Sequence, residues 1–205
     1  MSHMYRVNLL LVIMISLASS SFAAGGGEIV KADPNKHFDP KGKLPSEFTI
    51  ELQNGLRKSL PFEDKRDFEE AKKGFIAAPS YKQIMAEAGH VAWDMGSYEF
   101  LLTDKEYDTI HPSLQRQAVL NMAYGLYEVM PDKIYQIRGY DLANITFIKG
   151  EKGWIIFDPL TAKETAAAAL KFINEQLGER PVTAVVYSHS HADHFGGVRG
   201  VVEEA

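Results

Sequence analysis

The sequence contains no cysteine and no excess of positive charge. The absence of cysteine among the 205 residues excludes a disulfide scaffold, a cysteine-ligated zinc site and thiol catalysis. With 22 Lys and Arg against 27 Asp and Glu, the formal net charge is −5. Because no basic stripe is present, we expect no nucleic-acid partner. Hydrophobic residues (45%) and charged residues (24%) occur in globular proportions. The chain must therefore be stabilised by packing or by metal ligands other than thiolates.

Long apolar runs are also scarce, and the one extended run lies near the N-terminus. Leu9–Leu17 follows the basic residue Arg6 and is too short to span a bilayer, which needs ~20 residues. Small residues, Ser21 and Ala23, occupy the −3 and −1 positions of a cleavage site. Residues 1–23 are therefore predicted to be the signal peptide of a bacterial protein that is periplasmic or secreted. An uncleaved N-terminal anchor is the alternative, and after cleavage we expect no transmembrane segment.

The chain after this segment is predicted to begin with an irregular arm. Residues 24–55 start with consecutive glycines, contain Pro34, Pro40 and Pro45, and show no sustained periodicity. We expect them to wrap around a folded body rather than to form a domain of their own.

Three elements are expected before residue 125. Apolar residues at helical spacing predict a helix over 64–76. Alternating apolar residues on both sides of Gly96–Ser97 predict a β-hairpin over 91–102. Ser113 is expected to cap a helix that runs to about residue 124.

The second half of the chain has the most regular pattern. Thr161–Glu164 has the spacing of a capping box and predicts a helix that ends at Gly178. Val182–Tyr187 is nearly all apolar and is expected to be a strand buried on both faces of a sheet. Before the helix come four β-rich segments, Leu126–Met130, Ile134–Arg138, Asn144–Lys149 and Trp154–Phe157. Strands, helix and buried strand in this order predict an α/β fold.

Three of the seven histidines lie within six residues, directly after the last apolar segment. They are His189, His191 and His194, and Asp193 precedes the third. Imidazole and carboxylate are common zinc ligands. In extended backbone His189 and His191 project to the same side, as a pincer around one ion can, whereas the adjacent Asp193 and His194 diverge and cannot easily complete the tetrahedron around that same ion. This spacing favours two neighbouring metal ions at the C-terminal end of a strand, where α/β sheets present their sites.

Three interpretations of this cluster follow from the residues. The first is a polar loop with solvated histidines, and the second is a single structural or adventitious metal. The third, which the spacing favours, is two-metal hydrolysis, in which a metal ion lowers the pKa of a bound water. In this interpretation Asp193 is a catalytic residue that ligates one ion and also orients the water.

The cluster resembles the signature of the metallo-β-lactamase superfamily. The sequence upstream of it resembles, more specifically, the exported alkylsulfatases, zinc enzymes that hydrolyse dodecyl sulfate and similar surfactants. The superfamily signature indicates a metal hydrolase, and the upstream strings indicate an alkylsulfatase. The resemblance extends from about residue 56 to residue 201 and is carried by Lys58–Asp64, Arg66–Ala71, Gly74–Ala77, Pro112–Leu114, Tyr135–Thr146, Ile156–Leu160 and Tyr187–Gly197.

The resemblance implies a metallo-β-lactamase-like αββα sandwich. Residues 56–205 would be the N-terminal part of this catalytic domain, about its first half. Two Zn²⁺ ions are implied per complete active site, one held by His189 and His191 and the other by Asp193 and His194. The family has its remaining ligands, a helical dimerisation domain and a C-terminal domain further downstream, so a homodimer is expected for the full-length parent.

The expected reaction of that parent is zinc-dependent hydrolysis of an alkyl sulfate ester by a metal-activated water, which releases inorganic sulfate and an alcohol. We expect the isolated 205-residue chain to be poorly soluble and catalytically inactive, because half a sandwich leaves one sheet face uncovered. Two alternatives are another hydrolase of the superfamily, acting on esters, lactones or thioesters, and a truncated non-catalytic metal-binding module.

Two further residues have a functional and a structural interpretation. Asp158 follows a predicted strand and either orients a ligand histidine or is a turn residue before Pro159. Arg138 either contacts a sulfate or forms a buried ion pair with Asp141 or another acid, and the residues favour the ion pair.

Overall fold

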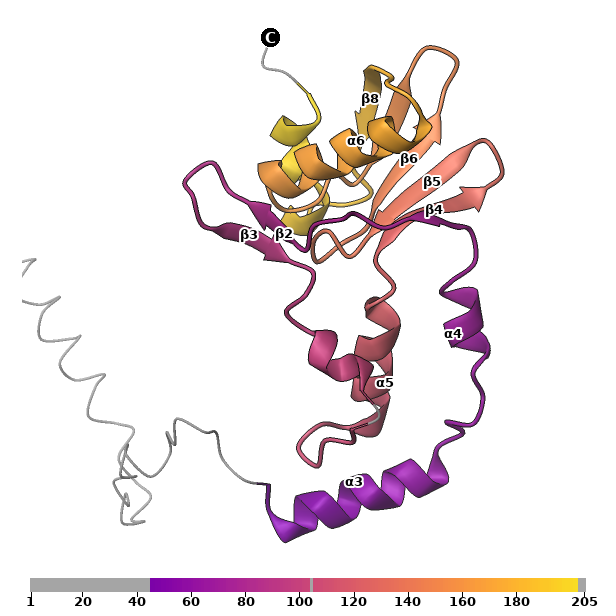
Figure 1. Ribbon diagram of the computed structural model, residues 1–205, viewed down its shortest axis with the longest axis vertical. Helices are drawn as coiled ribbons and strands as arrows, with labels where there is room; N and C mark the ends of the chain where they lie inside the picture. Colours follow the sequence, from indigo (N-terminus) through magenta and orange to yellow (C-terminus); the bar gives the residue numbers. More distant parts are fainter. Residues whose placement is uncertain (1–44, 104, 203–205) are drawn as a thin grey trace, which may run out of the picture. The chain divides into compact units, whose positions relative to one another are not determined.

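The computed structural model describes residues 45–103 and 105–202 (Figure 1). The predicted signal peptide and most of the predicted arm lie outside these residues. The α-helices are α3 (Glu47–Ser59), α4 (Arg66–Glu70), α5 (Pro112–Asn121) and α6 (Lys163–Leu177). The strands are β1 (Phe75–Ala77), β2 (Gln83–Met85), β3 (Val91–Asp94), β4 (Gly125–Met130), β5 (Ile134–Arg138), β6 (Ile145–Lys149), β7 (Trp154–Phe157) and β8 (Val182–Val186). Three short 3₁₀ helices are η1 (Glu99–Leu102), η2 (Ala192–His194) and η3 (Gly196–Gly200).

A six-stranded sheet with the order β1-β4-β5-β6-β7-β8 is the centre of the fold. Neighbouring strands from β1 to β7 are antiparallel, whereas β7 and β8 are parallel. A parallel pair needs a crossover connection, and α6 provides it (Figure 1). Strands β2 and β3 form a separate two-stranded sheet. This arrangement confirms the predicted α/β class.

One face of the sheet forms the core. Buried and half-buried residues alternate along β5, β6 and β7, as the period of two of a strand requires. The register places Tyr135 opposite Phe147, and Phe147 opposite Ile156. The Trp154 ring packs edge-on against Tyr135 and Phe147, with centroids 6.0 and 5.8 Å away. These aromatic contacts bind three adjacent strands into one apolar layer.

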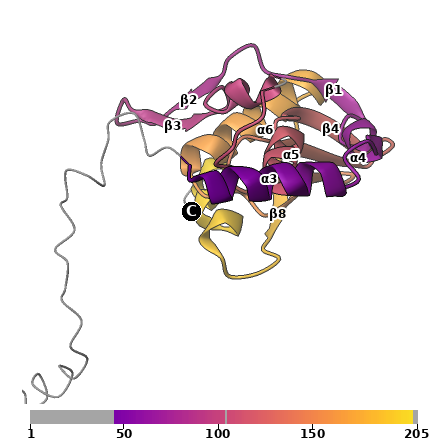
Figure 2. The same cartoon turned by 90° about the horizontal axis from the view of Figure 1, so that it is seen from below.

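Helix α6 covers this face of the sheet (Figures 1 and 2). Phe172 stacks on Tyr140 with ring centroids 6.0 Å apart. The indole Nε1 of Trp154 donates a hydrogen bond of 2.8 Å to the Asn174 side chain. The residues of the helix that are buried recur at helical spacing, and they are Thr165, Ala166, Ala169, Phe172 and Ile173.

The two predicted helix caps are wrong. Ala162 is the N-cap of α6 and makes no side-chain cap hydrogen bond, because the Thr161 hydroxyl donates to Asp141 instead. His111 caps α5, and its Nδ1 accepts a hydrogen bond from the amide of Ser113. Pro112 occupies the first turn of α5, and the cap lies two residues earlier than predicted.

The N-terminal helix lies partly inside the predicted irregular arm. Residues 47–55 belong to α3, which contradicts the prediction for this part of the arm. The Ser46 hydroxyl caps the helix by accepting a hydrogen bond from the amide of Thr49. The sequence pattern is weak because Gln53 is the buried residue of α3, while its apolar residues Phe48 and Leu52 are exposed.

The helix predicted over 64–76 is shorter than expected. Helix α4 ends at Glu70, and Gly74, with φ of +70°, precedes β1. A Cβ atom at Gly74 would lie 2.0 Å from the carbonyl oxygen of Glu128 in β4. The chain therefore turns at this glycine and pairs with the sheet instead of continuing the helix.

Two predictions about strands are also wrong. The segment 91–102 is not a hairpin, because β3 pairs with β2 and residues after Ser97 form η1. Strand β8 is not buried on both faces, since Thr183, Ala184 and Val186 are exposed. Within the described residues β8 pairs with β7 alone, so its outer edge is open.

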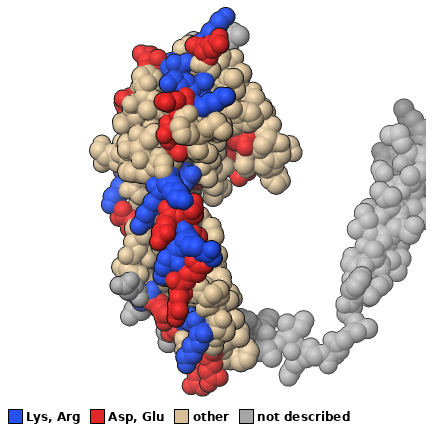
Figure 3. Space-filling model, turned by 90° about the vertical axis from the view of Figure 1, so that its right-hand side faces the viewer, with Lys and Arg blue, Asp and Glu red and all other residues tan. Residues whose placement is uncertain are grey.

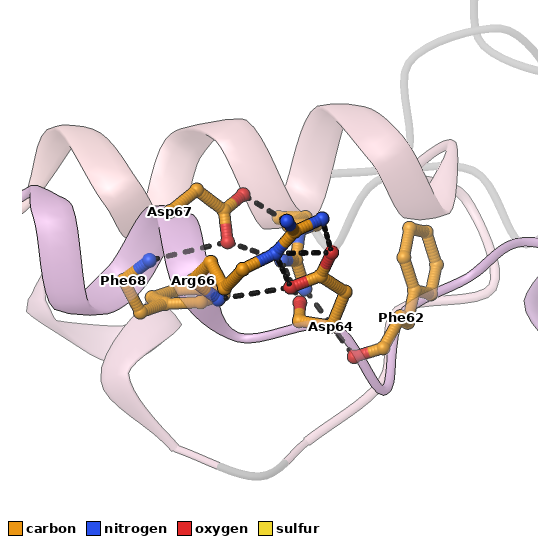
Figure 4. A network of polar contacts seen from close by, with 6 residues as sticks. Phe62, Asp64, Arg66, Asp67 and Phe68 are labelled. Atoms are coloured by element: carbon orange, nitrogen blue, oxygen red, sulfur yellow. Dashed lines mark hydrogen bonds and ion pairs between the residues drawn. The ribbon is translucent and has the colours of Figure 1, made fainter.

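Charges of both signs are interleaved on the face shown in Figure 3. Arg116 of α5 forms a network of polar contacts with the segment around α4, of which Figure 4 labels Asp64, Arg66 and Asp67. The Arg116 guanidinium pairs with Asp67, donates to the backbone carbonyls of Phe62 and Asp64, and lies over the Phe62 and Phe68 rings. Its side chain is 17% exposed, so this cation joins α5 to the segment around α4.

Among the described residues, no helix combines the length and the apolar composition needed to cross a bilayer.

Candidate metal centre

The histidine cluster follows the parallel strand pair at the edge where both strands end. Asp158 comes directly after β7, and Ser188 comes two residues after β8. The Asp158 carboxylate accepts hydrogen bonds of 2.7 Å from the amide and from the hydroxyl of Ser188. The amide of Asp158 in turn donates to the carbonyl of Val186. These bonds hold the two loops together and fix the position of the backbone just before His189, the first histidine of the cluster.

The three imidazole rings of the cluster lie close together. The His189 ring centroid is 4.6 Å from that of His191 and 4.1 Å from that of His194. The His194 Nε2 atom lies 3.4 Å from an Asp193 carboxylate oxygen. The two predicted ligand pairs are therefore neighbours rather than widely separated.

Asp158 contacts the cluster through the His194 ring. Its Oδ2 atom lies 2.9 Å from Nδ1 of His194, a buried nitrogen that has no partner with hydrogen-bond geometry. The Ser188 hydroxyl, which donates to Asp158, is also 2.9 Å from Nδ1 of His189. Ser188 is a residue that the sequence analysis missed, because a serine next to a histidine carries no distinctive signal.

The Asp158 carboxyl is held in its charged form. Partial burial acts to raise its pKa, but the hydrogen bonds from the hydroxyl and amide of Ser188 and the nearby His194 ring act to lower it. The net result is a pKa below the ordinary value of an aspartate. An ionised carboxylate at this position can orient imidazole rings through their Nδ1 atoms.

The cluster is accessible to solvent and incomplete as a single-ion site. His189 and His191 are exposed, whereas Asp193 and His194 are half-buried. In the part of the chain that the structure describes, no three His, Asp or Glu side chains are arranged to hold one ion. The cluster thus offers pairs of ligands, and each pair would need partners from elsewhere to complete a tetrahedron.

Two glycines after the cluster allow it to pack closely on the start of α6. A Cβ atom at Gly197 would lie 2.2 Å from the carbonyl oxygen of Pro159, and one at Gly196 would lie 2.4 Å from that of Thr161. The amide of Gly197 donates a 2.9 Å hydrogen bond to the carbonyl of Leu160. Any larger residue would push the cluster away from the segment on which it rests.

Arg138 is not paired with Asp141, so the predicted ion pair is wrong. Its Nε donates to Gln136, its Nη1 donates to the carbonyl of Ala71, and its guanidinium lies over the Tyr127 ring. The contact of Arg138 with a sulfate stays a prediction. Arg138 lines a cavity of 810 Å³ together with residues that include Trp93, Met95, Tyr98, Leu101 and Met122.

The sequence around this cluster is similar to that of known proteins. Residues 138–205 match the family model described as the metallo-beta-lactamase superfamily, whose members usually bind metal. An (R)-specific secondary-alkylsulfatase of a Pseudomonas species is 53% identical over 163 residues, covering 80% of this chain and 24% of that protein. This chain is a homologue of alkylsulfatases.

Two other alkylsulfatase relatives agree with this assignment. A linear primary-alkylsulfatase of a Pseudomonas species is 47% identical over 164 residues, 80% of this chain and 24% of the relative. The alkyl/aryl-sulfatase BDS1 of Saccharomyces cerevisiae is 45% identical over 157 residues, 77% of this chain and 24% of the relative. The chain thus spans about a quarter of the length of the curated relatives it matches.

A solved alkylsulfatase structure has the same fold over this region. The stereoselective inverting sec-alkylsulfatase Pisa1 from Pseudomonas sp. matches with a TM-score of 0.74 and 50% identity, covering 78% of this chain and 25% of that chain. The resemblance inferred from the sequence, to the alkylsulfatases of the metallo-β-lactamase superfamily, is confirmed. The α/β fold is of the metallo-β-lactamase type.

Proposed function

We propose that this chain is the N-terminal part of a zinc-dependent alkylsulfatase and supplies four of the ligands of its two Zn²⁺ ions. The reaction is hydrolysis of an alkyl sulfate ester to inorganic sulfate and an alcohol. The observation that carries the proposal is the sequence identity of 45–53% to three alkylsulfatases over about four fifths of the chain. A cluster of three imidazoles and one carboxylate at the strand ends provides the chemistry.

In this proposal His189 and His191 hold one zinc ion, and Asp193 and His194 hold the other. The 3.4 Å distance between Nε2 of His194 and the Asp193 oxygen supports a shared ion. Two donors that each lie ~2.0–2.1 Å from a tetrahedral zinc are separated by about 3.4 Å. The donor types, imidazole nitrogen and carboxylate oxygen, are those that zinc takes in hydrolases.

The residues around the ligands set the ligand tautomers. When the Ser188 hydroxyl donates to Asp158, its oxygen accepts from Nδ1–H of His189, which leaves Nε2 of His189 unprotonated. The Asp158 carboxylate faces Nδ1 of His194 and favours the same tautomer there. Bound zinc would supply a water of lowered pKa and a Lewis acid that polarises the oxygens of the sulfate group. Asp193, which is half-buried beside His194, would orient that water through its carboxylate.

The test measures metal content and sulfate release in the complete gene product that contains this chain. Elemental analysis of the purified protein should find two zinc ions, and chelation should abolish sulfate release from dodecyl sulfate. His189→Ala and Asp193→Ala should each lose zinc and at least ~100-fold in turnover. The matched control is His90→Ala, at an exposed histidine outside the cluster, which should keep both zinc and activity.

Other outcomes discriminate the alternatives. Turnover of an ester, lactone or thioester with no release of sulfate would assign the site to a different hydrolase of the superfamily. Bound zinc without turnover of any of these substrates would indicate a metal-binding module. Protein without zinc after incubation with excess Zn²⁺ would refute the proposal.

We also propose that the protein is exported and that residues 1–23 are removed. The support is the basic residue, short apolar run and small residues at −3 and −1 described above. N-terminal sequencing of the protein from the periplasm or medium should begin at Ala24. An intact N-terminus on membrane-bound protein would indicate the uncleaved anchor instead.

A further inference from the structure

Asp141 is a buried carboxylate that neutral groups surround. It is 7% exposed and lies in the turn between β5 and β6. Its oxygens accept hydrogen bonds from the Thr161 amide (3.1 Å) and hydroxyl (2.7 Å), and from the Ala162 amide (3.3 Å). The Thr165 hydroxyl (2.5 Å) and the Leu142 amide (2.7 Å) complete the set. Five hydrogen bonds to one carboxylate hold the Asp141 side chain and the groups that donate to it in fixed positions.

Three of these donors belong to the segment that connects β7 with α6, and a fourth, the Thr165 hydroxyl, lies in the first turn of α6. Ala162 is the N-cap of α6 and has no side-chain cap hydrogen bond of its own. The Asp141 carboxylate, which lies about 20 residues earlier in the chain, accepts instead from the two amides just before the helix, at its positive end. Asp141 therefore sets the position of the backbone at Thr161 and Ala162.

The same backbone is the surface on which the end of the histidine cluster rests. The Gly197 amide donates to the carbonyl of Leu160. A Cβ atom at Gly197 would lie 2.6 Å from the carbonyl oxygen of Ala162, and one at Gly196 would lie 2.4 Å from that of Thr161. Contacts this close transmit a displacement of Thr161 or Ala162 to Gly196 and Gly197, which lie two and three residues after His194.

We infer that Asp141 is a positioning residue for the metal centre, which acts through Thr161, Ala162 and the two glycines on His194 and Asp193. This inference rests on the proposed zinc site and adds a residue that reaches no metal or substrate itself. Asp141 lies 48 to 53 residues before the members of the cluster in sequence, and the β7–α6 segment joins them in space.

The test is Asp141→Asn in the complete gene product. An amide has the shape of a carboxylate, but its nitrogen cannot accept the hydrogen bonds that Oδ1 or Oδ2 accepts. We expect the zinc affinity of the protein, measured by competition with a chromophoric chelator, to fall by ~10-fold or more. The visible absorption of the Co²⁺-substituted protein, which reports ligand geometry, should also change.

The matched control is Asn174→Ala, on the same helix but facing Trp154 at the other end. It should lower the melting temperature without changing zinc affinity or the Co²⁺ spectrum, so it separates loss of stability from loss of positioning. If Asp141→Asn does not fold, Thr161→Val removes a single hydroxyl donor and should shift zinc affinity in the same direction by a smaller factor.

The two possible failures can be distinguished. Wild-type protein that binds no zinc would refute the proposed function. Wild-type protein that binds zinc, together with an Asp141→Asn or Thr161→Val variant of unchanged affinity and Co²⁺ spectrum, would refute the role of Asp141 and leave the proposed function standing.

Discussion

The carboxylate of Asp158 accepts both the amide and the hydroxyl hydrogen bonds of Ser188, each 2.7 Å long. The two residues are 30 positions apart in the chain and follow strands β7 and β8, the parallel pair of the sheet. Because α6 forms the crossover between these strands, the bond exists only when the whole β7–α6–β8 unit has folded. The backbone that leads into the ligand cluster therefore has a fixed position only in the folded protein.

Asp158→Asn is expected to weaken zinc binding more than it weakens the fold. The amide can still accept a hydrogen bond from Ser188, but it removes the negative charge that lies 2.9 Å from Nδ1 of His194 and orients that ring. Zinc affinity should fall ~10–100-fold. Chelator competition on the complete gene product measures this. Unchanged affinity would show that Asp158 is a turn residue with no role in orienting His194.

Gly197→Ala is expected to destabilise the protein by about 1–3 kcal/mol. Its Cβ atom would lie 2.2 Å and 2.6 Å from two backbone carbonyl oxygens, which have no freedom to rotate away. Gly55→Ala is the control, since no atom lies within 4 Å of a Cβ there and Gly55 is inside α3. This change should stabilise by about 0.5–1 kcal/mol. A urea midpoint of Gly197→Ala at or above that of the wild type would contradict the close packing at Gly197.

Arg116→Lys is expected to reduce stability by about 1–2 kcal/mol. A lysine keeps the charge but cannot pair with Asp67, donate to two carbonyls and cover two aromatic rings at once. Arg66→Lys is the control, because the Arg66 side chain is 84% exposed and its loss should have no measurable effect. Urea unfolding of both variants checks the difference, and equal stability of the two would mean that the Arg116 network adds little.

Asn174→Ala is expected to cost about 1–3 kcal/mol, because it leaves the buried indole N–H of Trp154 without its acceptor. Asn121→Ala serves as the comparison, since the Asn121 side chain accepts a hydrogen bond from Gln117 on the exposed surface of α5. Thermal unfolding monitored by Trp fluorescence should separate the two variants. Similar melting temperatures would show that Trp154 finds another partner.

Five of the six strands of the central sheet, β4 to β8, could be predicted almost to the residue. The segments expected at 134–138 and 154–157 are β5 and β7 as observed, because one buried face imposes strict alternation on these residues. Elements with little burial could not be predicted in the same way. Helix α3 buries Gln53 and exposes Phe48 and Leu52, so its apolar pattern gives no clear signal. Strands β1 and β2 are three residues long, too short for alternation to be read.

The choice of hydrogen-bonding partner was the other property that local patterns missed. The hairpin expected around Gly96 is not formed, because β3 pairs with the earlier strand β2. The capping threonine of α6 donates to Asp141 instead of capping its own helix. In both cases the partner differs from the one that the adjacent residues indicate: β3 pairs with the strand before it through a short turn, and Thr161 bonds to a side chain 20 positions away.

The sequence by itself determined the chemical types at the candidate site, three imidazoles and a carboxylate, and their position at the end of a strand. It also carried the alkylsulfatase resemblance. The tertiary structure decided which side chains support these ligands: Asp158 and Ser188 beneath the rings, and Asp141 behind the segment that Gly196 and Gly197 contact. The physical reason is that ligand type is a property of each residue, whereas a hydrogen bond between residues 20 or 30 positions apart requires the folded sheet and helix to bring them together.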